Sequence, residues 1–190
     1  MNGTPTTEPL PRDVEARLRN LDPTALSRQV LILPTQTRGG TTHYLADDVV
    51  AVQVARKGGL DAAYLVPAED RTYLEEYSAE WVLELAVAVM QGMTQDIATG
   101  IGAYLWERAK YVVGVGHHSG PVESVPMRLG LARYEREADG AVRIDNLVIE
   151  GSPENVEAAV RALVGHAATP ELVELDAHEV DQDGNSSEED

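Results

Sequence analysis

The chain has 190 residues, of which 43% are apolar, and it contains no cysteine. This length suffices for one globular domain with a sizeable core. The missing cysteines exclude disulfides, thiolate metal sites and a cysteine nucleophile. The formal net charge of −17, from 32 acidic and 15 basic side chains, repels phosphate backbones and argues against general nucleic-acid binding.

The first residues lack the basic start and apolar run of a secretory signal, so we expect a cytoplasmic protein. The apolar stretch 82–93 is interrupted by Glu84 and is shorter than the roughly 20 apolar residues of a membrane-spanning helix. Because the neighbouring polar side chains are acidic, docking on an anionic membrane surface is not expected either.

Composition divides the chain into a folded part and two tails. Residues 1–9 are small and polar, and they are predicted to be a disordered N-terminal tail. Residues 176–190 are acidic with almost nothing to bury, and they are predicted to be a mobile tail. Between them, 10–175 is expected to form a single α+β domain, with 10–110 and 111–175 as its possible sub-units.

The first half of this domain shows one short helix and three apolar runs. Leucine and valine recur at helical spacing over 10–21, which predicts a docked helix. The runs at 29–35, 48–56 and 60–67 are short, rich in branched residues and bounded by glycine or proline, which is typical of strands. Lys57, Gly58 and Gly59 predict a hairpin that joins the second strand to the third.

A long helix is predicted next. Thr72 and Glu75 have the spacing of a capping box, and apolar residues follow at helical spacing as far as Gly92. The pattern continues to Lys110, with a break expected near 92–102, where glycines cluster. Tyr111 then starts a possible strand that leads into a glycine-rich loop.

The C-terminal part predicts a β-β-α unit. Runs at 127–137 and 141–151 flank Asp139-Gly140, a dipeptide that favours two-residue hairpin turns. Ser152 as N-cap and Pro153 at the first helical position begin a helix that ends near residue 165. We therefore expect an α+β fold with two antiparallel β-hairpin regions, a long central helix and this unit.

The glycine-rich loop carries the first group of candidate site residues. His117, His118 and Glu123 offer imidazole and carboxylate ligands for a divalent metal, with His43 or His166 as a remote further ligand. His118 and Ser119 could instead act as base and nucleophile, although the flanking residues do not form the usual serine elbow. The loop glycines do not have the spacing of a phosphate cradle.

The predicted long helix carries the second group. Glu76, Glu80 and Glu84 share one helical face, which is either solvated or a groove for a basic partner. Gly92 and Gly100 permit close approach of another helix, within the protein or from a partner.

Because no catalytic motif is assembled, we expect a small non-catalytic interaction or accessory protein that binds another protein through its long helix or its acidic surface. One alternative is a metal-assisted hydrolase or transferase with its site in the 117–118 loop. Another is an acidic decoy or inhibitor of a nucleic-acid-binding protein. No cofactor is predicted beyond the metal of the first alternative, and a homo-oligomer is left open.

Overall fold

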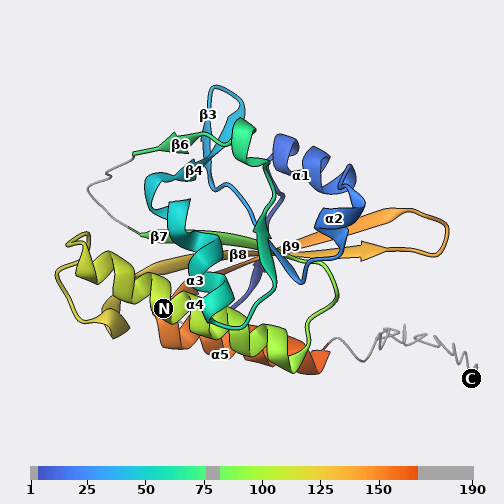
Figure 1. The fold of residues 1–190 in the computed structure, drawn as a ribbon. Helices are drawn as coiled ribbons and strands as arrows, with labels where there is room; N and C mark the ends of the chain where they lie inside the picture. The colour runs from blue at the N-terminus through green and yellow to red at the C-terminus, as the bar shows by residue number, and fades with distance from the viewer. Residues whose placement is uncertain (1–3, 76–81, 167–190) are drawn as a thin grey trace, which may run out of the picture.

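A six-stranded sheet forms the centre of the protein (Figure 1), in a computed structural model that describes residues 4–75 and 82–166. Helices α3, α4 and α5 cover one face of this sheet, and α1 and α2 cover part of the other. This architecture confirms the α+β class. The helices are α1 (Arg12–Arg19), α2 (Pro23–Leu26), α3 (Ala51–Lys57), α4 (Gln95–Gly114) and α5 (Pro153–His166). The strands are β1 (Thr6–Thr7), β2 (Val30–Ile32), β3 (Gln36–Arg38), β4 (Thr41–Leu45), β5 (Ala62–Tyr64), β6 (Tyr73–Leu74), β7 (Leu83–Val89), β8 (Met127–Arg136) and β9 (Val142–Gly151).

The strand order of the large sheet is β1-β9-β8-β7-β2-β5, and its pairing is mixed. β8 pairs antiparallel with β9, but β7 pairs parallel with β8, and β2 pairs parallel with β5. Helix α4 makes the crossover between the parallel strands β7 and β8, which a hairpin could not provide. The antiparallel hairpins that the sequence predicts therefore account for only part of the strand pairing, although the α+β class is right.

A second, smaller sheet has the order β3-β4-β6. β3 and β4 form an antiparallel hairpin, and β6 pairs parallel with β4. Helix α1 is tied to this hairpin because the Asp13 carboxylate accepts hydrogen bonds from Thr42 N at 2.7 Å and from Thr42 Oγ1 at 2.6 Å.

Several sequence predictions are confirmed. The helix over 10–21 is α1, whose Val14 and Leu18 are buried. The run at 29–35 contains β2. The β-β-α unit is β8, β9 and α5, with Gly140 at φ +88° in the turn and Ser152 Oγ accepting from Asn155 N.

The strand predicted over 48–56 is wrong, and so is its hairpin with the run at 60–67, although that run does contain a strand. Residues 46–50 form a 3-10 helix, η1, which leads directly into α3, so the branched run at 48–56 is helical. The Asp48 side chain accepts a hydrogen bond from Leu45 N and starts this turn. The run at 60–67 contains β5, which pairs with β2 instead of with its sequence neighbour.

The helix predicted from Thr72 to Gly92 is also wrong. Its first part contains β6, and 83–89 is the central strand β7, with Leu83, Leu85 and Val87 buried. The second part of the prediction is correct, since α4 is the chain's 20-residue helix. Tyr111 lies in the last turns of α4, so the strand expected from there is wrong as well.

The two predicted tails have different outcomes. Thr6 and Thr7 pair with β9, so part of the segment 1–9 belongs to the sheet. The predicted tail at 176–190 lies outside the described residues. Within the two described ranges, no helix has the length and apolar character needed to cross a bilayer.

Candidate functional site

Helix α1 covers only part of its sheet face. Its buried residues pack with Leu31, Leu33, Ala88 and Ala132, which lie near one end of the central strands. Towards the other end the same face carries the small residues Ala86 and Gly130. Since α1 is only eight residues long, it does not extend over this end, and the face is left hollowed.

A pocket of about 200 Å³ occupies the hollow, and a second pocket of about 810 Å³ adjoins it, with Val125 and Met127 of the core on the opposite side of the sheet in its lining. They share Thr35, Glu84 and Arg128 in their linings, and we call the combined hollow the Arg128 groove. It is further lined by Glu8, Ala86, Gly130, Asn146 and Glu150, and by the apolar or hydroxyl-bearing residues Val82, Ser124, Val125, Pro126, Met127 and Ser152.

Strand register brings the charged side chains of the groove into one row. Glu84 is the direct partner of Arg128 across β7 and β8, and Arg128 is the partner of Glu150 across β8 and β9. The Arg128 guanidinium donates to Glu8 Oε2 at 2.5 Å and to Glu150 Oε1. Partial burial opposes the charge of Arg128, but the surrounding carboxylates outweigh that effect and raise its pKa.

Two buried oxygens beside this row have no hydrogen-bond partner among the described residues: Asn146 Oδ1 and Thr35 Oγ1. Asn146 is only 9% exposed, and its Nδ2 donates to the Glu8 carbonyl at 3.0 Å, which fixes the orientation of the amide. A Cβ placed on Gly130 would lie 3.8 Å from Asn146 Oδ1, so this oxygen faces the floor of the groove. An unmade bond at a buried acceptor costs about 1–3 kcal/mol, and a bound proton donor would recover it.

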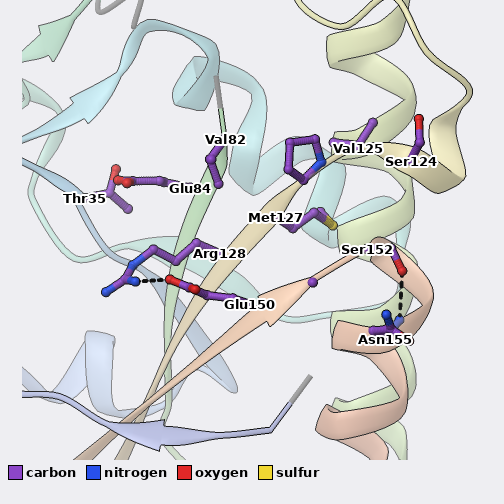
Figure 2. Close-up of a pocket in the computed structure, with 12 residues that line it drawn as sticks. Thr35, Val82, Glu84, Ser124, Val125, Met127, Arg128, Glu150, Ser152 and Asn155 are labelled. Atoms are coloured by element: carbon purple, nitrogen blue, oxygen red, sulfur yellow. Dashed lines mark hydrogen bonds and ion pairs between the residues drawn. The ribbon is translucent and has the colours of Figure 1, made fainter. Parts of the chain in front are cut away.

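The groove changes character along its length (Figure 2). Thr35 and Glu84 lie together at one end, near Arg128, and Ser124, Ser152 and Asn155 lie at the other. Val82 and Met127 lie between these two ends. A molecule with an apolar body and polar ends matches such a lining.

The two loop histidines turn to different partners. His117 Nε2 lies 3.4 Å from Asp47 Oδ2, whereas His118 Nε2 lies 3.0 Å from Ser124 Oγ. The Ser124 hydroxyl donates its proton to the Pro121 carbonyl at 2.8 Å, so the histidine ring acts as donor in the second contact. That polarity is opposite to the one that a serine nucleophile needs.

The predicted metal ligands are not brought together in the described part of the chain, where no three acidic or histidine side chains form a possible ion site. Glu123 is exposed, and Ser119, the predicted nucleophile, is exposed as well. His43 contacts Thr72 Oγ1 in the small sheet, and the side chain of His166 lies outside the described set.

The predicted interaction residues also separate. Glu76 and Glu80 lie outside the described residues. Gly92 is exposed in the turn after β7, at φ +78°. Gly100 is buried inside the protein, where a Cβ would meet the Leu60 side chain at 2.5 Å. Of the described members of this group, only Glu84 lies in the Arg128 groove, where its Oε2 accepts from Gln36 Nε2 at 2.7 Å.

A buried ion pair joins η1 to α4 elsewhere in the core. Arg108 donates to Asp48 Oδ1 at 2.9 Å, and both side chains are almost fully buried. Burial raises the pKa of Asp48 to about 6, against the lowering effect of Arg108. The pair is enclosed between helices and does not line either pocket of the groove, so we assign it to the core.

Comparison of the chain with models of protein families, with curated proteins and with solved structures returned no match. Any functional assignment therefore depends on the site itself. Sequence reasoning missed Thr35, Arg128, Asn146 and Glu150, which come from segments far apart in the chain. The signal that was available is the alternation along β8, which places Arg128 and Gly130 on one face.

Proposed function

We propose that the protein is a small non-catalytic accessory protein that binds its partner in the Arg128 groove. The observation that carries this proposal is a pair of buried oxygens in residues that line the hollow, Asn146 Oδ1 and Thr35 Oγ1, which have no hydrogen-bond partner among the described residues. Buried polar groups in folded proteins are nearly always satisfied, so groups left unsatisfied at a pocket indicate a place for a ligand.

The proposal keeps the non-catalytic role that the sequence indicates but moves the contact region. The buried face of α4 packs against α3 and α5, so it is not available to a partner. In the groove, by contrast, Glu84, Arg128 and Glu150 are held by three neighbouring strands of the sheet, which is the arrangement expected of a preformed site.

The histidine loop adds nothing that favours catalysis. His118 supports Ser124 at the rim of the groove, and His117 contacts Asp47 at η1. Both contacts fit a structural role, in which the histidines hold the segment between α4 and β8 in place. The groove therefore supports uptake of a binding partner better than the loop supports a reaction.

A native mass spectrum of the protein, purified gently from its own cells, tests this proposal. Ala86→Leu fills the floor of the groove, and Ala158→Leu is the matched control because Ala158 is exposed on α5. We expect a co-purifying species on the wild-type protein and on Ala158→Leu, and we expect Ala86→Leu to lose it.

Two outcomes would contradict the proposal. One is retention of the bound species by Ala86→Leu, which would place the binding site elsewhere. The other is stoichiometric metal mass that disappears in a His117→Ala/His118→Ala variant, which would move the site to the loop. Circular dichroism of each variant checks that the fold is intact.

A further inference from the structure

The charges in the Arg128 groove do not balance. Among the described residues, three carboxylates line it, those of Glu8, Glu84 and Glu150, against the single guanidinium of Arg128. All 15 lysine and arginine residues of the chain lie within the described ranges, and no other one lines either pocket. No lysine or arginine of the segments outside those ranges can therefore neutralise the excess of two negative charges.

Hydrogen-bonding capacity shows the same excess. Of the two unpartnered buried atoms of the groove, Asn146 Oδ1 can only accept, and the Thr35 hydroxyl can accept as well as donate. Two of the five N–H donors of Arg128 are directed at Glu8 and Glu150. A ligand that brings several N–H donors and positive charge meets both deficits at once, whereas an anionic ligand would add to the carboxylate repulsion.

We infer that the group bound in the Arg128 groove is an alkylammonium or guanidinium group, held at the end where Thr35 and Glu84 lie (Figure 2). This inference rests on the proposed function, because it names the chemistry of the partner of the same site. Glu84 is the charged contact, and Asn146 Oδ1 is a buried acceptor in the lining of the same groove. The apolar residues Val82 and Met127 then contact the alkyl chain that carries the cation.

Two sources supply this chemistry: a small free amine or guanidine, and a lysine or arginine side chain of a protein. Agmatine represents the first and N-acetylarginine methylamide the second. Calorimetric titration of the full chain with each probe measures their affinities under the same conditions. The probe that binds more tightly identifies the source, and binding of either supports the inference. Glutarate serves as an anionic probe and 1,5-pentanediol as a neutral one.

Glu84→Gln tests the charged contact, because it removes the negative charge and keeps the size of the side chain. Glu69→Gln is the matched control, because it removes the same charge outside the groove: Glu69 is exposed in the 3-10 helix Ala68–Asp70. We expect Glu84→Gln to raise the Kd of the cationic probe about tenfold, the range of one charge-assisted hydrogen bond. Glu69→Gln should leave the Kd within about twofold, the effect of a screened surface charge.

The inference is overturned if glutarate or 1,5-pentanediol binds in the groove and the cationic probes do not. In that case the groove still binds a ligand, so the proposed function stands. It is also overturned if Glu84→Gln and Glu69→Gln change the affinity for the cationic probes equally. If a probe binds as well to Ala86→Leu as to the wild-type protein, it does not occupy the groove, and the proposed function fails together with the inference.

Discussion

Gly100 offers a sharp test of how the helices pack. It lies inside α4, and a Cβ added there would be 2.5 Å from Leu60 Cδ2 and 2.7 Å from Leu60 Cγ. Ordinary contacts between such atoms are about 3.5–4.0 Å, so the Leu60 side chain would have to move by about 1 Å. Leu60 is only 3% exposed, and the clash includes Cγ, the branch point of its side chain. Rotation of the two terminal methyl groups therefore cannot make room for the added Cβ.

Two opposing effects set the stability of Gly100→Ala. Replacement of glycine by alanine inside a helix stabilises by about 0.5–1 kcal/mol. Overpacking of a filled core costs about 1–3 kcal/mol. The second effect is larger, so we expect the free energy of unfolding to fall by about 1 kcal/mol, and the midpoint of thermal unfolding to fall by about 2–4 °C.

Urea unfolding followed by far-ultraviolet circular dichroism measures this change. Gly114→Ala is the control, because a Cβ at that position of the same helix meets no atom within 4 Å. Leu60→Val shortens the obstructing side chain, so Gly100→Ala should cost less in the Leu60→Val background than in the wild type. If Gly100→Ala is as stable as the wild type, or the cost is unchanged in that background, the close approach of Leu60 to α4 is refuted.

Three further predictions concern the fold. Val160 is fully buried on α5, so Val160→Asp should lower the free energy of unfolding by several kcal/mol, and an unchanged thermal melt would refute the helix packing. Gly140 has φ +88°, so Gly140→Val should lower the free energy of unfolding by about 1–3 kcal/mol in urea unfolding. An unchanged free energy of unfolding would refute the strained turn. Burial opposes the ionised form of Asp13, but hydrogen bonds from Thr42 outweigh burial and lower its pKa from 3.8. The ionised carboxylate therefore stabilises the fold at neutral pH, and this stabilisation is lost as the pH falls through the lowered pKa. The difference in stability between wild type and Asp13→Asn should therefore shrink below pH 3.8, and a difference independent of pH would contradict this.

The sequence predicts an element correctly where several local signals, such as a cap, a turn dipeptide and an apolar face, indicate the same structure. At α5, the cap Ser152, the proline after it and the apolar face all indicate the same helix. At the β8–β9 hairpin, Asp139-Gly140 and the alternating flanks indicate the same turn. In both cases the stabilising contacts are close in the sequence, which is why a local pattern suffices.

The prediction failed where tertiary context decides. In β7, large apolar residues alternate with period two: Leu83, Leu85, Val87 and Val89. The alanines between them also fit a helix, so the helical pattern predicts the wrong element here. The branched run at 48–56 favours a strand by propensity, yet burial of one face and the Asp48 turn make it helical.

Local patterns predict only part of the groove, namely the face of β8 that carries Arg128 and Gly130. Its residues come from the segment before α1, from the end of β2 and from three further strands, and only the sheet register brings them together. Glu84 was singled out in the sequence for its place in an apolar run, but as part of a helix. The pairing of Glu84 with Arg128 and the unpartnered oxygen of Asn146 depend on contacts between segments, so neither can be predicted from one segment alone.

The most direct test of the account is a two-dimensional NMR titration of the nitrogen-15-labelled full chain with agmatine. The backbone amide of Gly130 and the side-chain amide of Asn146 lie at the floor of the groove and report its occupancy. We predict that both resonances shift with one common affinity, and that Ala86→Leu abolishes the shifts. Shifts confined to exposed acidic positions such as Glu69, with Gly130 and Asn146 unmoved, would contradict the assignment of the groove as the binding site.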